Sequence, residues 1–335
     1  MQPGGVRQQW STDVNCLLAR ESYGFYREIN DHLETLVRPV LQTCGYLFLA
    51  HSSAALEQLK RNVELQNTHG IPSRVVASGE IAGLAEGIRT DDVVGGSFCS
   101  EDGYFDKPQA VVEAFAQAAV GLGASIELSE VTALRVNGGG WELDLGQGRR
   151  AYSDQVVVAA SYDTNALLAT LGVELPLTKA ARYLFLSEPI RERLLEPLVI
   201  SQELHFAAKH LADGRVLASD LSAHGDPSVG TKQWRDHIRA VVERLLPILH
   251  YVSFPVLVEG FYDMTPDSQG IVSAVDGFDG LWVAAGFSGH GFMIAPAVGR
   301  AMSDLLQGRD PGAPFGQLDV DRFARSDLPL ETQVV

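Results

Sequence analysis

The chain has 335 residues, of which 46% are apolar and 20% charged, a composition typical of a soluble globular protein of one or two domains. Its formal net charge of −16 argues against nucleic-acid binding, which needs clustered Lys and Arg. No apolar run reaches the roughly 18 residues of a membrane span or forms a secretory leader. The three cysteines are odd in number and form no C-x-x-C pair, which suits a reducing compartment. We therefore predict a cytoplasmic protein, and we expect neither nucleic acid nor a membrane as its partner.

Hydrophobic periodicity divides the first half of the chain between helices and strands. Apolar residues that recur every three or four positions predict amphipathic helices. These stretches are 14–36, 54–66 and 108–122. Short apolar or alternating runs predict strands. They lie at 45–50, 125–128, 131–136, 141–145 and 156–160. Because the last run is apolar throughout, we expect a parallel strand that is buried on both faces.

The second half begins with short strands separated by turns, a pattern typical of an antiparallel sheet. These strands are predicted at 183–186, 205–208 and 215–219. A helix at 232–246, before Pro247, and strands at 256–261 and 281–285 follow. A final helix is expected to open near Ala295 and to run to Leu306. After Gly308 the sequence is rich in Pro, Gly and Asp, and we expect it to lie loosely on the surface.

The segment 286–292, Gly-Phe-Ser-Gly-His-Gly-Phe, follows the last predicted strand directly. Four small residues in seven let backbone amides approach a ligand closely, and the helix that follows points its positive end at the same place. Such a turn suits an electron-rich ring or a phosphate, although many strand–helix turns bind nothing. His290, inside the turn, could donate to a ligand or cap the helix.

This segment continues as GFSGHGFMIAP and is preceded by FYDMTPD at 261–267. Together the two strings resemble the C-terminal flavin segment of the D-amino-acid oxidase-like FAD-dependent oxidoreductases, which include sarcosine oxidase, glycine oxidase and the β-subunits of amine and proline dehydrogenases. Three further segments resemble the family in the same order. They are 4–9, like its flavin-edge loop, 103–108, like its helix-opening turn, and 156–160, like its third nucleotide-binding strand.

The resemblance implies a mixed α/β fold in which an incomplete Rossmann-like FAD-binding domain is interleaved with an antiparallel-sheet substrate domain. The chain would cross between the two domains several times. The FAD-binding domain would comprise 1–13, 101–178 and 262–310, the substrate domain 14–100 and 179–261, and the tail 311–335.

One part of the family pattern has no counterpart in this sequence. Family members begin with a strand, a G-x-G-x-x-G turn and a helix whose N-terminus holds the FAD pyrophosphate. The glycine cluster 138–140 precedes an alternating run and therefore predicts a hairpin turn. The cluster 79–83 lies in a polar connection with no predicted strand before it. The nucleotide-binding domain is thus expected to be incomplete.

Two explanations of this gap stay open. The start of the sequence was set too late, or the protein lost the unit and serves as a non-catalytic binding or assembly subunit without FAD. Loss would expose strand edges and apolar helix faces, a serious defect unless a partner covers them, which favours the first explanation. The likeness to dehydrogenase β-subunits also leaves room for a homo- or hetero-oligomer.

For the cofactor, the resemblance implies FAD and hydride transfer from a carbon next to nitrogen to flavin N5. Backbone amides of the turn would stabilise negative charge on the reduced ring. Arg7 and His290 are the candidate catalytic residues, since a fixed cation beside the ring would favour hydride acceptance. The implied cofactor-binding residues are Gly5, Val6, Arg7, Val131, Ala160, Gly286, Ser288, Gly289, His290, Gly291, Phe292 and Met293.

The expected substrate is a small amine or amino acid, whose carboxylate would need a cation or paired donors. Sarcosine oxidase-like enzymes carry a lysine where this chain has Met293 and an arginine where it has Trp10, which argues against a monomeric sarcosine oxidase. Methionine at that position is more like the dehydrogenase β-subunits. Arg182, Tyr262 and His205 are the candidate substrate residues, each also open to a structural role. Lys209 falls at a predicted strand end and is not selected.

Overall fold

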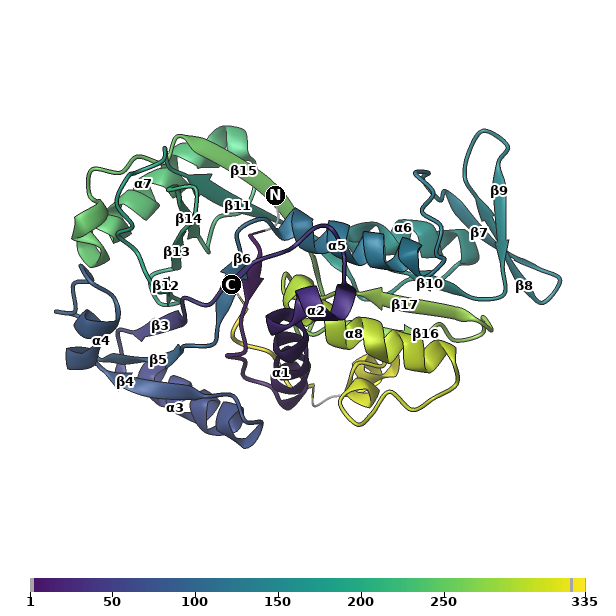
Figure 1. Cartoon of the computed structure of the whole chain (residues 1–335), viewed down its shortest axis with the longest axis horizontal. Coiled ribbons are helices and arrows are strands. Elements are labelled where there is room, and N and C mark those ends of the chain that lie inside the picture. Colours follow the sequence, from purple (N-terminus) through teal and green to yellow (C-terminus); the bar gives the residue numbers. More distant parts are fainter. Residues whose placement is uncertain (1–2, 326–327, 335) are drawn as a thin grey trace.

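The computed structural model describes residues 3–325 and 328–334. Figure 1 shows two lobes, with both ends of the described chain between them. One of them, the large-sheet lobe, is built on an eight-stranded sheet of order β15-β11-β14-β13-β12-β3-β5-β4. Its strands are β3 (Tyr46–Ala50), β4 (Ser73–Ala77), β5 (Gly95–Cys99), β11 (Thr178–Leu186), β12 (Leu198–Ser201), β13 (Phe206–His210), β14 (Val216–Asp220) and β15 (Val256–Met264). Neighbours are antiparallel except β12 and β3, which run parallel.

Three helices pack on the large sheet, namely α3 (Ser53–Thr68), α4 (Ser78–Leu84) and α7 (Pro227–Leu245). The sequence marks the start of α7, because Asp226 caps it by accepting the Ser228 N–H and Pro227 takes its first position. The buried residues of α7 follow a helical period. They are Trp234, Ile238, Val241, Val242 and Leu245. With the sheet they form the largest apolar core of the protein.

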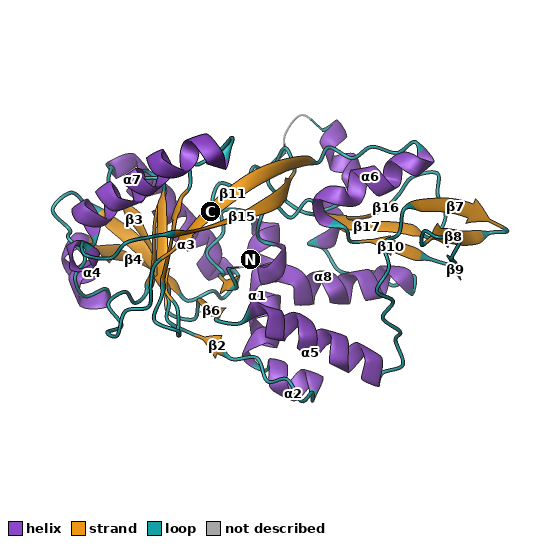
Figure 2. Ribbon diagram, turned by 90° about the horizontal axis from the view of Figure 1, so that it is seen from above, coloured by secondary structure: helices purple, strands orange, loops and turns teal. Residues whose placement is uncertain are grey.

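The other lobe, the α8 lobe, contains two three-stranded sheets. One has the order β10-β17-β16, with β10 (Val156–Val158) parallel to β17 (Leu281–Ala285) and β16 (Ile271–Ala274) antiparallel to it. The other is the meander β7 (Ala133–Asn137), β8 (Gly140–Asp144) and β9 (Arg150–Ser153). The helices of this lobe are α5 (Pro108–Gly121), α6 (Thr164–Leu168) and α8 (Gly291–Leu306). Figure 2 shows β11 and β15 running from the large-sheet lobe across to this lobe.

A small sheet and two helices lie between the lobes. β6 (Gly103–Phe105) pairs with both β1 (Gly5–Val6) and β2 (Leu41–Gln42). The helices α1 (Asp13–Arg27) and α2 (Ile29–Leu33) lie beside it. The short 3₁₀ helices of the described chain are Ser161–Asp163, Ala169–Leu171, Pro247–Leu249, Phe315–Gln317 and Val320–Ala324.

The contact between α1 and α8 compensates for a proline inside a helix. Pro296 has no N–H, so it cannot donate to the carbonyl four residues earlier, that of Phe292. The Tyr26 hydroxyl donates to this carbonyl instead, at 2.6 Å, and the Ser22 hydroxyl accepts the Ala297 N–H at 3.2 Å. Two polar side chains on α1 therefore take up hydrogen-bonding groups of α8 next to the proline, and they fix how the two helices pack.

The mixed α/β fold is as predicted, and most predicted elements are present with ends shifted by a few residues. Several details differ from the predictions. The first predicted helix is broken at Glu28 into α1 and α2. The glycine cluster 79–83 follows a strand after all, β4, and lies in α4, but β4 is antiparallel to β5 and is not part of a βαβ unit. Residues 125–128 form no strand.

The last helix begins at Gly291, four residues before the predicted start. Pro296 lies past its first turn, where the Tyr26 and Ser22 hydroxyls of α1 take up the neighbouring hydrogen-bonding groups. The run 156–160 is a parallel strand only over Val156–Val158. It is only partly buried, because β17 is its one sheet neighbour in the described chain.

The tail does not lie loosely on the surface. Phe315, Leu318, Arg322, Glu331 and Gln333 are each no more than 3% exposed. Apolar packing accounts for the first two, and hydrogen bonds and an ion pair to distant residues account for the other three. The composition of the tail predicted a loose surface position, and this was wrong because the partners that hold the tail lie far away in the sequence and leave no local signal.

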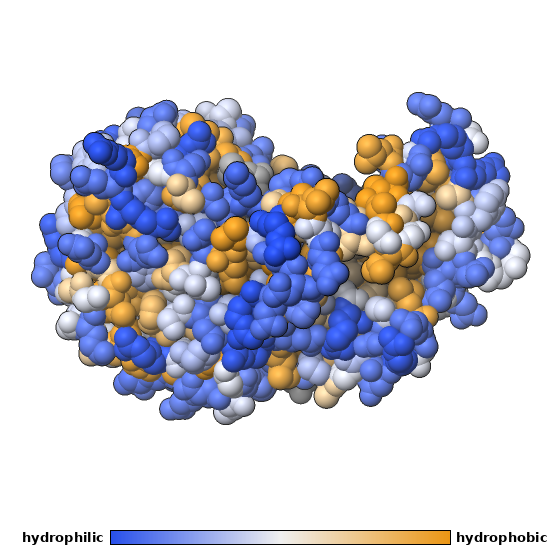
Figure 3. Space-filling model, viewed as in Figure 1, coloured by the Kyte–Doolittle hydropathy of each residue, from blue (hydrophilic) through white to orange (hydrophobic). Residues whose placement is uncertain are grey.

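Three further observations concern membrane spans, cysteines and the apolar surface. None of the helices in residues 3–325 and 328–334 has the length and apolar character needed to cross a bilayer. Cys16, Cys44 and Cys99 are free thiols. Figure 3 shows apolar side chains at the surface of the α8 lobe. Leu122, directly after α5, and Leu128 are 90% and 95% exposed.

The buried ion pair of the tail generates a stability prediction. Arg322 donates to both carboxylate oxygens of Asp267, at 2.8 and 3.2 Å, and the two side chains are 3% and 1% exposed. Asp267→Asn should lower the free energy of unfolding by roughly 3–5 kcal/mol, because it leaves a buried guanidinium uncompensated. Urea unfolding measures this change. Asp236→Asn, which removes an exposed partner of Lys232, is the control and should leave the midpoint almost unchanged; equal effects of the two substitutions would contradict the prediction.

Candidate active site

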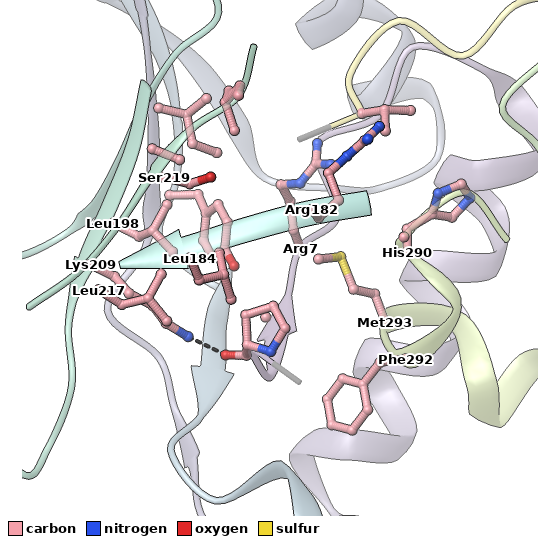
Figure 4. A pocket seen from close by; sticks show the side chains of 18 of the residues that line it. Arg7, Arg182, Leu184, Leu198, Lys209, Leu217, Ser219, His290, Phe292 and Met293 are labelled. Atoms are coloured by element: carbon pink, nitrogen blue, oxygen red, sulfur yellow. Dashed lines mark hydrogen bonds between the residues drawn. The ribbon is translucent and has the colours of Figure 1, made fainter. Parts of the chain in front are cut away.

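A cavity between the lobes brings together segments that are far apart in the sequence (Figure 4). Its wall on the large-sheet side is mainly apolar and includes Leu184, Leu198 and Leu217. The opposite wall is the glycine turn after β17 with the first turn of α8. Residues from the β1 segment close a further side. The lining residues used below are Gly5, Arg7, Trp10, Tyr46, Arg182, Lys209, Tyr262, Ser288, Gly289, His290, Phe292, Met293 and Val334.

The glycine turn is braced by the end of β15. The carboxylate of Asp263 accepts the Gly286 N–H at 2.7 Å, and its carbonyl accepts the Ser288 N–H at 3.0 Å. The Thr265 N–H donates to the Ser288 hydroxyl at 3.2 Å. Burial raises the pKa of Asp263. The segment FYDMTPD thus fixes the backbone of the turn rather than contributing a reactive group.

Gly289 is required by the ring of Tyr262. Its φ is +90°, and a Cβ at this position would lie 2.1 Å from Tyr262 Cε2. A residue with a side chain would therefore be strained and would push the tyrosine away. The close approach places the start of α8 at the cavity. The Met293 N–H donates to the His290 carbonyl at 3.0 Å, whereas the N–H groups of Gly291 and Phe292 bond to no described residue and carry the positive end of the helix dipole.

His290 is a buried histidine without a hydrogen-bond partner. It is 2% exposed, and neither ring nitrogen bonds to any described residue. Its ring centroid lies 4.6 Å from that of Trp10. Burial lowers the pKa of His290 to about 4, so the ring is neutral at physiological pH. Two unused buried nitrogens at a cavity indicate a site for a ligand that supplies their partners.

Arg7 is also buried, with 2% exposure. Its guanidinium donates to the carbonyls of Gln9 and Gln333, each at 2.5 Å, and lies 3.8 Å from the centre of the Trp10 ring. Burial lowers its pKa, but a guanidinium remains charged in proteins. Within the described chain no carboxylate lies within ion-pair distance of this cation.

Two more cations line the cavity. The guanidinium of Arg182 donates to the Ala181 carbonyl and to the Met264 sulfur, and none of the described carboxylates forms an ion pair with it. Lys209 is 3% exposed in β13, and its ammonium donates to the Pro3 carbonyl. Burial lowers the pKa of Lys209 to about 8. The part of the cavity lining that the structure describes contains no acidic side chain, so the cavity is electropositive although the chain as a whole is acidic.

A buried carboxylate holds the N-terminal loop in place. Asp102 accepts the Gln8 N–H at 2.8 Å and the Gln9 side-chain amide at 3.0 Å. Burial raises the pKa of Asp102 to about 6. The side chain of Gln9 also bonds to the Tyr46 carbonyl and to Ser97 in the large sheet. Arg7 is therefore presented by a firmly anchored segment.

A second, separate groove lies beside β10. It is lined by two of the predicted cofactor-binding residues, Val131 and Ala160. Its other residues are mostly apolar, with Glu130 and Asp163 as acids. No glycine is among its lining residues in the described part of the chain.

The structure thus gathers most of the predicted site residues, with informative exceptions. Val6 is buried in an apolar cluster, Gly286 and Gly291 form the ends of the glycine turn, and His205 is exposed in the turn between β12 and β13. Sequence reasoning did not select Lys209, and it missed Tyr46 and the tail residue Val334. Only pairing partners and tail contacts, which are not local patterns, could have revealed these three.

The glycine turn and the cationic residues thus line one cavity in a mixed α/β fold. The chain belongs to the family described as FAD dependent oxidoreductase (DAO), whose model matches residues 3–305. The predicted family is therefore confirmed, and the protein is an FAD-dependent oxidoreductase.

Relatives in the comparisons agree with this assignment. FAD-dependent oxidoreductase domain-containing protein 1 of Xenopus laevis is 24% identical over 379 residues, covering 100% of this chain and 76% of the relative. The 4-methylaminobutanoate oxidase (formaldehyde-forming) of Paenarthrobacter nicotinovorans is 27% identical over 301 residues, covering 84% of this chain and 36% of that protein. The solved structure of L-proline dehydrogenase from P. horikoshii matches with a TM-score of 0.88 and 24% identity, over 97% of this chain and 87% of that one, which shows the fold.

The residues at the cavity fit a flavin ring. The orphaned nitrogens of His290 can bond to a polar ring edge, the start of α8 offers free N–H groups, and the leucine wall suits a flat aromatic face. Gly5 fits a close approach as well, since a Cβ there would lie 2.4 Å from the Tyr46 hydroxyl oxygen. The residues that would hold the ring are Gly5, Arg7, Ser288, Gly289, His290, Phe292 and Met293.

The low pKa of His290 generates a pH prediction. Between about pH 6.5 and 4 this histidine is protonated in the unfolded chain but stays neutral in the folded chain. The contribution of the neutral histidine to the free energy of unfolding is therefore complete above pH 6.5 and is lost as the pH falls towards 4. From pH 7 to 5 the wild type should lose about 2 kcal/mol more free energy of unfolding than His290→Gln.

Urea unfolding of the purified chain at the two pH values measures this difference. Asp102 acts in the opposite direction, because its raised pKa favours the folded state at low pH, but it does so equally in both proteins. The exposed His224 provides the control, and His224→Gln should behave as wild type. The same pH dependence in wild type and His290→Gln would contradict the buried neutral histidine.

Proposed function

We propose that the protein oxidises the C–N bond of an amino acid or of a secondary or N-methyl amine that carries a carboxylate. The observation that carries the proposal is the charge of the cavity. Arg7, Arg182 and, below about pH 8, Lys209 are cations around one space with no carboxylate among its described lining residues. The names of two relatives support the substrate class, 4-methylaminobutanoate oxidase and the sarcosine dehydrogenase of Homo sapiens, the latter 26% identical over 84% of this chain.

In the proposed arrangement each cavity wall has a distinct role. Arg182 binds the substrate carboxylate, and Tyr262, whose ring lies 5.0 Å from that guanidinium, borders the same space. The apolar wall of Leu184, Leu198 and Leu217 excludes water from the carbon next to nitrogen. FAD, when bound, supplies the acceptor for the hydride of that carbon at its N5 position. The resulting imine is hydrolysed by water.

The groups opposite the apolar wall prepare the site for negative charge. The free N–H groups at the start of α8 and the fixed charge of Arg7 favour a reduced, anionic ring. Neutral His290 can donate one hydrogen bond to the ring edge without adding charge. An amine that enters unprotonated needs no protein base, which accounts for a cavity without a carboxylate among its described residues.

The domain boundaries predicted from the sequence, the cytoplasmic location and a homo- or hetero-oligomer are parts of the same proposal. The cavity supports the division, because one wall comes from segments assigned to the FAD-binding domain and the other from segments assigned to the substrate domain. The elution volume of the purified chain in size-exclusion chromatography would test for a homo-oligomer. Cosedimentation of the chain with a purified partner protein would test for a hetero-oligomer.

A second candidate is a family member that does not retain FAD and acts as a binding or assembly subunit. The observation that favours it is the second groove, where β10 has one sheet neighbour in the described chain and apolar residues are left open. A nucleotide-binding partner strand would have to pair there.

The visible absorption spectrum of the purified chain distinguishes the two candidates. The enzyme proposal predicts about one FAD per chain, bleached by an N-methyl or secondary amino acid under anaerobic conditions. Refolding or incubation with added FAD serves as a control for cofactor lost in purification. A folded chain that stays colourless in both preparations overturns the enzyme proposal and supports the second candidate.

Arg182 provides a test of substrate recognition. Arg182→Met should raise KM for carboxylate-bearing amines by about 10- to 100-fold, the value of a charge-assisted hydrogen bond, and should leave flavin content unchanged. Arg182→Lys should recover part of the loss. Steady-state kinetics with a matched pair of amines, one with and one without a carboxylate, measure the effect. An equal change for both amines would mean that Arg182 has only a structural role.

A further inference from the structure

The tail segment 328–334 returns to the centre of the molecule. Figure 1 shows this last, yellow segment running from the α8 lobe to a position between the lobes. Hydrogen bonds to residues far away in the sequence fix its backbone. Gln269 donates to the Pro329 carbonyl at 2.6 Å, the Glu331 N–H donates to the Asp267 carbonyl at 3.0 Å, and Gln202 donates to the Thr332 carbonyl at 2.9 Å.

The carboxylate of Glu331 is the main anchor of the segment. It is buried, with 2% exposure of the residue, and lies at the start of α1, where Thr12 supplies no cap of its own. It accepts the Ser11 N–H at 3.0 Å, the Ser11 hydroxyl at 2.5 Å and the Thr12 hydroxyl at 2.8 Å. The Asn15 amide donates to it at 3.1 Å. A carboxylate more than 300 positions away thus holds the residues at the N-terminus of α1, where the helix dipole favours a negative charge.

The same carboxylate also fixes the peptide that touches Arg7. Glu331 Oε1 accepts the Gln333 N–H at 2.9 Å, and the Gln333 carbonyl accepts a hydrogen bond from Arg7 Nη2 at 2.5 Å. The other terminal nitrogen of Arg7 is held by the Gln9 carbonyl. The guanidinium is thereby clamped over the Trp10 ring. The next residue, Val334, lines the cavity itself.

We propose that segment 328–334 is part of the active site and that Glu331 is a positioning residue, which orients the Gln333 carbonyl and through it the Arg7 guanidinium at the cavity. The placement of Arg7 is independent of the proposed function. Its consequence, a higher reduction potential of the bound flavin, rests on the proposed function.

Charge near Arg7 is consistent with this role. Two nearby carboxylates, those of Glu331 and Asp102, favour the charged form of Arg7. Glu331 does not touch the guanidinium, so the cation stays available to a ligand. The other ionisable groups near Arg7 are the hydroxyls of Tyr46 and Tyr262 and the ring of His290, which are all neutral at physiological pH.

The first test reads the placement of Arg7 without any cofactor. Trp10 emission is obtained as the difference between each protein and the same protein with Trp10→Phe. Glu331→Gln and deletion of residues 328–335 should both change this emission, because the guanidinium leaves the ring face. In an Arg7→Gln background, Glu331→Gln should produce no further change. Asp321→Asn, the same chemical change at an exposed position, is the matched control.

The second test reads the consequence at the flavin. In loaded protein, Glu331→Gln and Arg7→Gln should each shift the reduction potential of FAD to a lower value at unchanged flavin content, and the double variant should resemble Arg7→Gln. Unchanged Trp10 emission in Glu331→Gln, or equal effects of Glu331→Gln with and without Arg7, would overturn the positioning role. A chain without FAD would defeat the proposed function alone, since the emission cycle still decides the role of Glu331.

Discussion

The buried guanidinium of Arg7 is the constraint on which the centre of the structure depends. A cation that is withdrawn from water costs several kcal/mol unless other groups compensate for its hydration. Here no carboxylate among the described residues pairs with it. Two backbone carbonyls, the face of Trp10 and the more distant charge of Glu331 stabilise it instead. Because Gln9 and Gln333 both bond to Arg7, the segments near the two ends of the chain meet between the lobes.

The contacts around the glycine turn and α8 bring backbone groups, rather than reactive side chains, to the cavity that Arg7 lines. Asp263 and Thr265 at the end of β15 hold the glycine turn. The absence of a side chain at Gly289 lets the Tyr262 ring lie against it. The hydroxyls of Tyr26 and Ser22 stabilise α8 around its proline. Several buried polar contacts therefore aim one helix terminus at the cavity, and the large sheet provides the opposite apolar wall.

The contrast between an acidic surface and a cationic cavity follows from this arrangement. The chain carries a formal net charge of −16, yet its cavity is lined by two arginines and a lysine. Such a cavity favours an anionic ligand over a neutral one of similar shape. Separating the charges in this way suits a family that handles both a reduced flavin and, in this proposal, a carboxylate.

The sequence determined the elements and the backbone-based part of the site. The run before Gly286, the small residues of the turn and the helical period after it specify a strand, a glycine turn and a helix, because these signals are local and repeat with the geometry of the backbone. The family resemblance and the mixed α/β fold rest on the same ordered motifs, and both were predicted correctly. Local signals were wrong for the tail, for residues 125–128 and for the burial of β10.

Only the tertiary structure decided which side chains share the cavity. Arg7 is buried rather than solvated because Asp102 and the tail anchor its loop, and the residue that meets it, Gln333, is 326 positions away. Lys209 lies in the cavity because the pairing of β13 with β14 sets which way its side chain points. His205 falls in the turn before β13, where it is exposed. Contacts of this kind depend on long-range packing, which has no period along the chain, so composition and spacing cannot reveal them.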